Sequence, residues 1–165
     1  MPELLKNPTV LLILCAAGAF AAAEPDFSGT YTTQKKHDSK SIVLRVVQSD
    51  SAVEVTRISE GKSNTNRFPL DGSEGEYTTE TGVRGKCKAQ MKNQALVLES
   101  LTAPPVRAGS PSIRLHIIEE WQLSRDGNTL TIKTEIKSPD MPSEVMAAAF
   151  PNNPWKEKYQ RTDKP

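Results

Sequence analysis

Hydrophobic and polar residues alternate along most of this chain. In the stretch VRGKCKAQMK, residues 83–92, small or apolar residues take the odd positions, and one arginine and three lysines take four of the five even ones. A period of two is typical of a β-strand with one buried and one solvated face. The same pattern predicts roughly nine or ten short strands, at 27–33, 41–48, 52–59, 64–70, 76–79, 83–92, 95–101, 112–123, 129–137 and 155–161.

Tight turns join most of these strands. Asp50-Ser51 and Asp71-Gly72 lie between alternating segments, and Asp126-Gly127 forms the tip of a strong hairpin signal. Strands joined by hairpins pair antiparallel. A long meander must protect its edges, and closing into a barrel is the usual solution. We therefore predict an all-β fold, an antiparallel up-and-down meander closing into a barrel, with a two-sheet sandwich as the alternative.

Two segments break the alternation. Residues 102–111, TAPPVRAGSP, hold three prolines and a glycine, and proline cannot serve the interior of a strand ladder. This segment is predicted to be a loop. Pro142, Glu144 and a run of alanines predict a short helix at 143–150, which Pro151 stops before the last strand.

The hairpin around Asp126-Gly127 sets a register that places an acid on an apolar face. The predicted pairs are Leu123 with Leu130, Trp121 with Ile132, Glu119 with Thr134, and Ile117 with Ile136. A carboxylate on an apolar face costs free energy unless it is paired or hydrogen-bonded. Three interpretations of Glu119 stay open. It is a polar anchor in a ligand cavity, it is buried and paired with an arginine, or a bulge at Ile118 turns it to water.

The small residues of the 83–92 stretch are predicted to face the interior. Gly85, Cys87 and Ala89 either receive bulky partners such as Trp121 and Tyr159 from across the barrel, or leave room for an apolar ligand. The basic residues on the opposite face are typical of a solvated sheet surface.

The first residues have the features of an export signal. Residues 10–20 form an apolar core, and small residues at alternate positions precede possible cleavage after Ala21 or Ala23. The apolar run is shorter than the roughly 20 residues of a spanning helix. We predict a signal peptide at 1–23 and one domain at 24–165, exported to the periplasm or secreted.

Charge and cysteine content limit the partners of this domain. The 165 residues carry 21 basic and 20 acidic side chains, a net charge of +1, which does not favour nucleic acid or a membrane surface as a partner. Cys15 lies in the predicted leader, where a lipid-anchored start is the alternative. Cys87 is then alone, so no internal disulfide forms. A lone cysteine most often packs as a small apolar residue, with a nucleophile or an intermolecular bridge as alternatives.

The start of the domain resembles lipocalin-like and fatty-acid-binding-like barrels. Those families open with an aromatic residue followed by Gly-x-Trp, and in DFSGTYTT the residues Phe27, Gly29 and Tyr31 match, with Tyr in place of Trp. The meander through WQLSRDGNTLTI and the ending with Tyr159 and a basic residue are also similar. Small exported bacterial proteins share this pattern. The resemblance implies a lipocalin-like, calycin-type barrel with a short helix before the last strand and a small hydrophobic ligand inside.

Three features depart from those families. Only QKKHDSK, residues 34–40, separates the first two predicted strands, which leaves no room for the two lid helices of fatty-acid-binding proteins. The order Tyr159-Gln160-Arg161 replaces the Arg-x-Tyr with which that family holds a carboxylate. Many lipocalins also carry a disulfide, which this chain cannot form.

Enzyme chemistry has little support in the residues. His37 lies in a polar loop and His116 on a strand, so two separated histidines and one cysteine give no metal-ligand spacing. No nucleophile elbow and no phosphate-binding loop is present. We assign no catalytic residue, metal or cofactor.

The leading hypothesis is an exported binding protein that holds a small apolar or amphipathic ligand in its barrel. The candidate ligand-binding residues are Glu119, Trp121, Cys87, Tyr159 and Gly85. The alternative is a structural or interaction protein of the envelope, with a filled barrel and function on its loops. A protein partner would then contact the segments 102–111 and 141–150.

Overall fold

The computed structural model describes residues 24–33, 41–104 and 112–163. These residues form one antiparallel sheet of ten strands and a short helix, and no helix among them is long and apolar enough to cross a membrane. The elements are β1 (Gly29–Thr33), β2 (Ile42–Gln48), β3 (Ala52–Ser59), β4 (Lys62–Pro69), β5 (Gly75–Thr78), β6 (Arg84–Lys92), β7 (Ala95–Thr102), β8 (Leu115–Leu123), β9 (Thr129–Lys137), α1 (Ser143–Ala149) and β10 (Trp155–Arg161). The predicted all-β fold with one helix before the last strand is confirmed.

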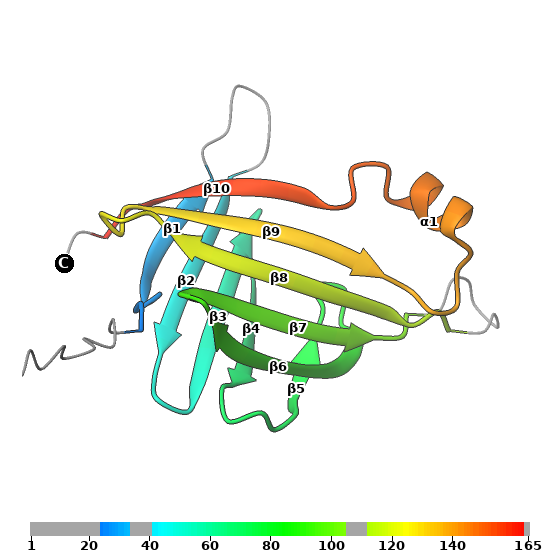
Figure 1. Ribbon diagram of the computed structural model, residues 1–165, viewed down its shortest axis with the longest axis horizontal. Helices are drawn as coiled ribbons and strands as arrows, with labels where there is room; N and C mark the ends of the chain where they lie inside the picture. The colour runs from blue at the N-terminus through cyan, green and yellow to red at the C-terminus, as the bar shows by residue number, and fades with distance from the viewer. Residues whose placement is uncertain (1–23, 34–40, 105–111, 164–165) are drawn as a thin grey trace, which may run out of the picture.

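The sheet follows the chain order and closes on itself. Its strand order is β4-β3-β2-β1-β10-β9-β8-β7-β6-β5, so β1 pairs with β10 and every other pair joins strands that are consecutive in the chain. The sheet curls until its two edge strands, β4 and β5, contact each other (Figure 1). This nearly closed barrel confirms the predicted meander and excludes the two-sheet sandwich.

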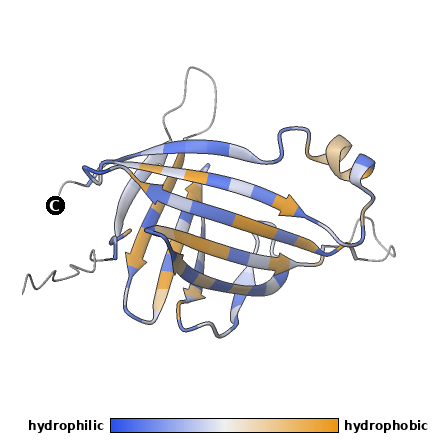
Figure 2. Ribbon diagram, viewed as in Figure 1, coloured by the Kyte–Doolittle hydropathy of each residue, from blue (hydrophilic) through white to orange (hydrophobic). Residues whose placement is uncertain are grey.

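The register predicted for the long hairpin is confirmed. β8 and β9 pair Leu123 with Leu130, Trp121 with Ile132, Glu119 with Thr134 and Ile117 with Ile136. The pairing is unbroken from His116 to Leu123, so the bulge proposed at Ile118 does not occur. Apolar and polar residues alternate along the strands, as Figure 2 shows. The strand begins at Leu115 rather than at residue 112, because the backbone N–H of Arg114 donates to the carboxylate of Asp140 instead of to a strand neighbour.

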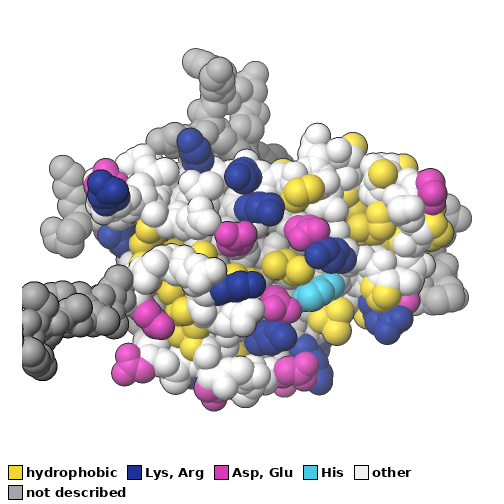
Figure 3. Space-filling view, in the orientation of Figure 1, with side chains coloured by type: hydrophobic (Ala, Val, Ile, Leu, Met, Phe, Trp, Pro, Cys, Tyr) yellow, Lys and Arg dark blue, Asp and Glu magenta, His cyan; other side chains and the backbone are white. Residues whose placement is uncertain are grey.

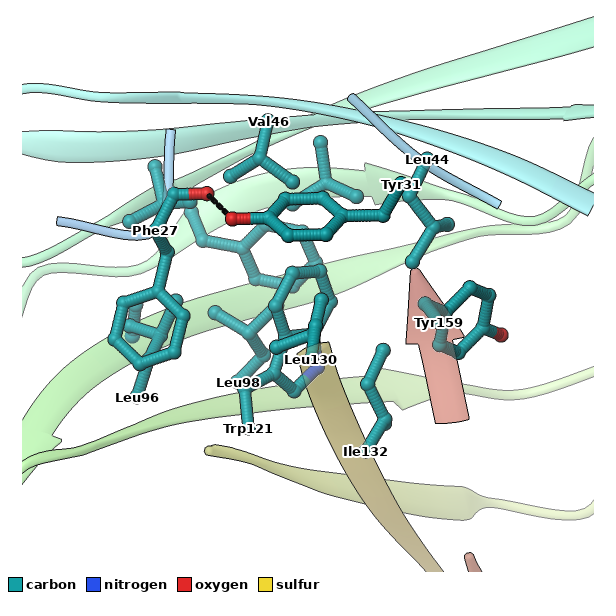
Figure 4. Packing of buried hydrophobic residues seen from close by; sticks show 14 of the residues in the cluster. Phe27, Tyr31, Leu44, Val46, Leu96, Leu98, Trp121, Leu130, Ile132 and Tyr159 are labelled. Carbon is teal, nitrogen blue, oxygen red and sulfur yellow. Dashed lines mark hydrogen bonds between the residues drawn. The ribbon is translucent and has the colours of Figure 1, made fainter. Parts of the chain in front are cut away.

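The two ends of the barrel differ. In an antiparallel meander, alternate connections lie at opposite ends. The short β2–β3, β6–β7 and β8–β9 turns and the entry of the chain lie at one end, and α1 stands beyond the other (Figure 1). Phe27, Tyr31 and Trp121 are fully buried and pack together in the half of the barrel nearer the short turns (Figure 4). Large aromatic side chains therefore fill much of this half.

The motif that carries the family resemblance seals this closed end. The Tyr31 hydroxyl donates to the Phe27 carbonyl at 3.0 Å. The Arg161 guanidinium lies 5.1 Å from the centre of the Tyr31 ring and donates to its hydroxyl oxygen at 2.9 Å. Gly29 has a φ of 149°, which residues with a side chain rarely adopt, and a Cβ atom there would lie 2.8 Å from the Arg161 guanidinium, which would have to shift. Phe27, Gly29, Tyr31 and Arg161 thus act as one structural unit.

Side-chain amides close the seam between β4 and β5. Asn66 Nδ2 donates to the Thr78 carbonyl at 3.0 Å, and the Thr78 N–H donates to Asn66 Oδ1 at 2.8 Å. Asn64 Nδ2 donates to the same carbonyl at 3.0 Å. The amide of Asn66 therefore pairs with the Thr78 backbone as a strand partner would.

Replacing Asn66 by alanine is expected to lower the free energy of unfolding by about 1–2 kcal/mol, because the Thr78 N–H loses its acceptor and the Thr78 carbonyl loses one of its two donors. Urea denaturation measures the loss. Thr65→Ala is the matched control, since its hydroxyl bonds only Thr56 on the exposed outer face. Equal losses in the two variants would contradict a closing role for Asn66.

Candidate functional site

A cavity of about 220 Å³ lies inside the barrel at the end that carries α1. Its apolar walls are formed by Ile42, Ile117, Ile132, Ile136 and Trp155. Its polar lining comes from Arg57, Glu80, Glu119, Thr134, Glu157 and Tyr159. The volume is below the range of about 300–1,000 Å³ typical of ligand pockets, because aromatic side chains fill the other half of the barrel.

An ion pair crosses the barrel at the inner end of this cavity. Arg57 on β3 and Glu119 on β8 face each other, and Arg57 Nη2 donates to the two carboxylate oxygens at 2.7 and 2.6 Å. Their side chains are 23% and 18% exposed, so the pair is largely removed from water. Trp121 Nε1 donates to Glu119 Oε2 at 3.1 Å, and the guanidinium lies 6.0 Å from the indole centre. The polar end of the cavity thus rests on the buried Trp121.

The electrostatics of the pair hold Arg57 charged. Burial lowers the pKa of Arg57, but the charge and hydrogen bond of Glu119, together with the nearby Tyr77 and Tyr159, more than offset burial, so the pKa of Arg57 lies above its ordinary value. Of the three interpretations of Glu119, exposure through a bulge is wrong, and burial beside an arginine is what the structure shows. A role in holding a ligand remains a prediction, and Glu119 lies where that role requires it.

Tyr159 and Glu157 form a second polar pair on the cavity wall. Both lie on the inward face of β10, and the Tyr159 hydroxyl donates to Glu157 Oε2 at 3.0 Å. Burial and the charge of Glu157 raise the pKa of Tyr159, so the hydroxyl stays protonated. The hydroxyl of Tyr159 points away from the packed rings of Phe27 and Tyr31 (Figure 4).

Cys87 and Gly85, the other two predicted site residues, lie outside this cavity lining. Cys87 is buried between β5 and β7, and its Sγ lies 3.2 Å from the Arg67 carbonyl and 3.4 Å from the Glu76 carbonyl. A Cβ atom at Gly85 would lie 2.1 Å from the Leu101 carbonyl oxygen, so its smallness accommodates the neighbouring strand. Cys87 belongs to the packed core, as a small apolar residue does.

Burial raises the pKa of the Cys87 thiol to about 11, so little thiolate exists at physiological pH. In a Cys15→Ser variant, which leaves Cys87 as the sole thiol, alkylation by iodoacetamide at pH 8 is expected to be about a hundredfold slower in the folded than in the urea-unfolded protein. Similar rates would contradict the buried placement. The same shift means that the stability contributed by the neutral thiol is present below pH 9 and is lost as the pH rises through 11.

Two further hollows border the cavity. A groove of about 440 Å³ lies between β9 and α1, lined on the helix side by Met146, Ala147 and Phe150, and it shares Ile136 with the cavity. A polar hollow of about 180 Å³ beside the β3–β4 turn shares Arg57 with it. None of the residues of α1 is buried, so the helix leaves the groove beneath it open.

A larger hollow, about 580 Å³, lies on the outer surface over β6–β9. Its charged groups already have partners: Lys86 with Glu74, His116 and Lys88 with Glu99, and Arg114 with Asp140. Figure 3 shows acidic and basic side chains interspersed on this face, as on an ordinary solvated sheet. We therefore place the candidate site inside the barrel. Among the described residues, no group of three or more His, Cys, Asp or Glu side chains is arranged to hold a metal ion.

Sequence reasoning missed Arg57, Glu157 and Trp155. Each had a signal in its strand. Arg57 follows the buried Val53 and Val55 at alternate positions of β3, so all three lie on one face of the strand. Glu157 likewise lies between Trp155 and Tyr159 at alternate positions of β10. Extending the period of two through these polar residues would have placed them inside.

By sequence, the chain matches no known protein family and no curated protein. By structure, it is similar to barrels of one class. A REP1-NXSQ fatty acid transporter aligns with a TM-score of 0.56 at 12% identity, covering 85% of this chain and 98% of that chain. The Echinococcus granulosus fatty-acid-binding protein 1 aligns with a TM-score of 0.54 at 14% identity, covering 83% and 98%.

A third similar structure is a secretary abundant heat soluble (SAHS) protein from Ramazzottius varieornatus, with a TM-score of 0.55 at 11% identity, covering 82% of this chain and 94% of that chain. Identities this low establish the fold alone. The fold is that of the lipocalin-like, or calycin, β-barrels, which confirms the class that Phe27, Gly29 and Tyr31 indicated.

Proposed function

We propose that the protein binds a small apolar or amphipathic molecule in the cavity at the α1 end of the barrel. The observation that carries the proposal is an apolar-walled cavity that ends on a buried polar cluster, with Ile117 and Ile136 leading to Arg57 and Glu119. Ligand sites commonly combine apolar walls with a few fixed polar groups. Two of the similar structures are named for fatty acid transport or binding, which supports a hydrophobic ligand.

The cavity volume limits the ligand. Only a small molecule, or one end of a longer one, fits within about 220 Å³. The groove between β9 and α1 shares Ile136 with the cavity and offers a path for the rest of a longer ligand.

Calorimetry with octanol tests the proposal. Ile117→Phe narrows the cavity and is expected to weaken binding at least about tenfold. Ile118→Phe is the matched control, because Ile118 lies on the opposite face of the same strand and should leave binding unchanged. No binding to the unmodified protein, or equal weakening in both variants, would refute a ligand site in the barrel.

We also propose that the protein is exported, on the strength of the apolar core and small residues within 1–23, which lie outside the described residues. The intact mass of the protein recovered from its producing cell is expected to equal that of a chain that begins at Ala22 or Glu24. Leu12→Arg, which interrupts the apolar core, should retain the full-length mass. A natural protein that begins at Met1 would refute processing.

The second candidate function is protein interaction at the 141–150 segment. The observation that favours it is the exposed helix α1, where Val145 is 48% exposed. The other predicted contact segment, 102–111, lies largely outside the described residues. If neither the unmodified protein nor its variants bind octanol, this candidate is the one to pursue.

A further inference from the structure

The charges that line the cavity do not match those expected for a carboxylate ligand. Arg57 is the single cationic side chain of the described lining, whereas Glu80, Glu119 and Glu157 are all acidic. Glu80 lies exposed at the rim, and the other two lie within the barrel. The lining is therefore net negative even with the ion pair counted as neutral.

One nitrogen of the Arg57 guanidinium is engaged by Glu119. This nitrogen, Nη2, contacts both oxygens of Glu119 within 2.7 Å. A ligand carboxylate that took Nη2 would displace Glu119, which would leave that acid unpaired on an apolar face. A second carboxylate beside the intact pair would instead face two glutamates, and like charges at this range disfavour each other.

Glu157 is the acid that remains for a ligand to contact. Its polar partner is the hydroxyl of Tyr159 on the same strand, and the ion pairs found among the described residues do not include it. The neighbouring Lys156 and Lys158 alternate to the exposed outer face. A carboxylate has about four acceptor positions, so a donor from the ligand would find unused capacity here.

The surroundings of Glu157 suit a cation as well. Trp155 and Tyr159 lie two residues to either side and line the same cavity. Aromatic faces attract an ammonium group within about 6 Å of the ring centre. Acid and rings together form a lining that stabilises positive charge.

We infer that the cavity takes an amphiphile with an amine head, bound at Glu157, rather than a fatty acid carboxylate. This inference rests on the proposed ligand-binding function. The isoleucines of the walls contact the first part of the alkyl chain. The groove beneath α1, which shares Ile136, receives the remainder.

Three ligands with one alkyl chain and different heads test the charge preference. Octylamine, octanol and octanoate are titrated separately into the full protein near neutral pH, below the concentrations at which they aggregate, with calorimetry as the readout. Octylamine is expected to bind about tenfold or more tightly than octanoate, with octanol between them.

Glu157→Gln tests whether this acid sets the preference. The substitution keeps the shape of the side chain and removes its charge, so the ratio of octylamine to octanoate affinity should fall about tenfold. Glu120→Gln is the matched control, because Glu120 lies on the outer face of β8, bonded to Gln122. It should leave all three affinities unchanged.

The outcomes separate this inference from the proposed function. Octanoate binding as tightly as octylamine, or an unchanged ratio in Glu157→Gln, overturns the amine preference and leaves the cavity as a ligand site. Failure of octanol, octylamine and octanoate alike to bind overturns the ligand-binding function, and the amine inference with it.

Discussion

Replacing Glu119 by alanine is expected to lower the free energy of unfolding by about 3 kcal/mol. The substitution leaves Arg57 charged and largely buried without its partner, and it removes the acceptor of the Trp121 indole N–H. Breaking a buried ion pair from one side typically costs about 3–5 kcal/mol, and residual exposure of both side chains places this pair at the lower end. Urea denaturation monitored by tryptophan fluorescence measures the loss.

A double-mutant cycle isolates the pair itself. Arg57→Met combined with Glu119→Leu should cost far less than the sum of the single changes, because no buried charge is left unpaired. Losses that simply add would show that the two side chains do not interact in solution. Glu120→Ala, on the outer face of the same strand, should change stability by less than about 0.5 kcal/mol.

Replacing Gly85 by alanine is also expected to cost about 3 kcal/mol. The new Cβ would lie 2.1 Å from the Leu101 carbonyl oxygen and 2.9 Å from the Thr102 methyl group. The carbonyl belongs to the paired strand β7 and cannot rotate away, so the two strands must separate locally. Overpacking of this kind typically costs about 1–3 kcal/mol, and a contact with backbone lies at the upper end.

Gly61→Ala provides the comparison for Gly85. No atom lies within 4 Å of a Cβ at that turn, but its φ of 76° is left-handed, so a loss of only about 1 kcal/mol is expected. Thermal unfolding measures both variants. A loss at Gly85 no greater than at Gly61 would show that β6 and β7 do not approach as closely as described.

The strands and the hairpin register could be predicted from the sequence because two independent signals agree there. Alternation of apolar and polar residues set the faces, and Asp126-Gly127 fixed the turn. Once Leu123 lay opposite Leu130, the inward position of Glu119 followed. Which residues of a strand share a face depends on their spacing along the chain, and a single sequence carries that information.

The site was predictable only in part, because its geometry depends on strands distant in sequence. Arg57 lies 62 residues before Glu119, and no local pattern says which arginine crosses the barrel to meet that acid. Gly85 illustrates the same limit. Its small size suggested either a bulky partner or room for a ligand, but the neighbour that requires it is the backbone of Leu101.

Cavity volume is likewise a property of the whole packing. The sequence placed Trp121 and Tyr159 inside, but not at which level of the barrel. Trp121 is fully buried beneath the ion pair, whereas Tyr159 lines the open half. That difference separates a residue supporting the site from one that lines the cavity.

Native mass spectrometry of the protein isolated from its producing cell tests ligand binding most directly. The predicted spectrum shows the chain with one small molecule bound, the adduct disappears on denaturation, and an organic extract yields an amphiphile. A spectrum of the bare chain, combined with no uptake of octanol or octylamine, would contradict a binding site in the barrel.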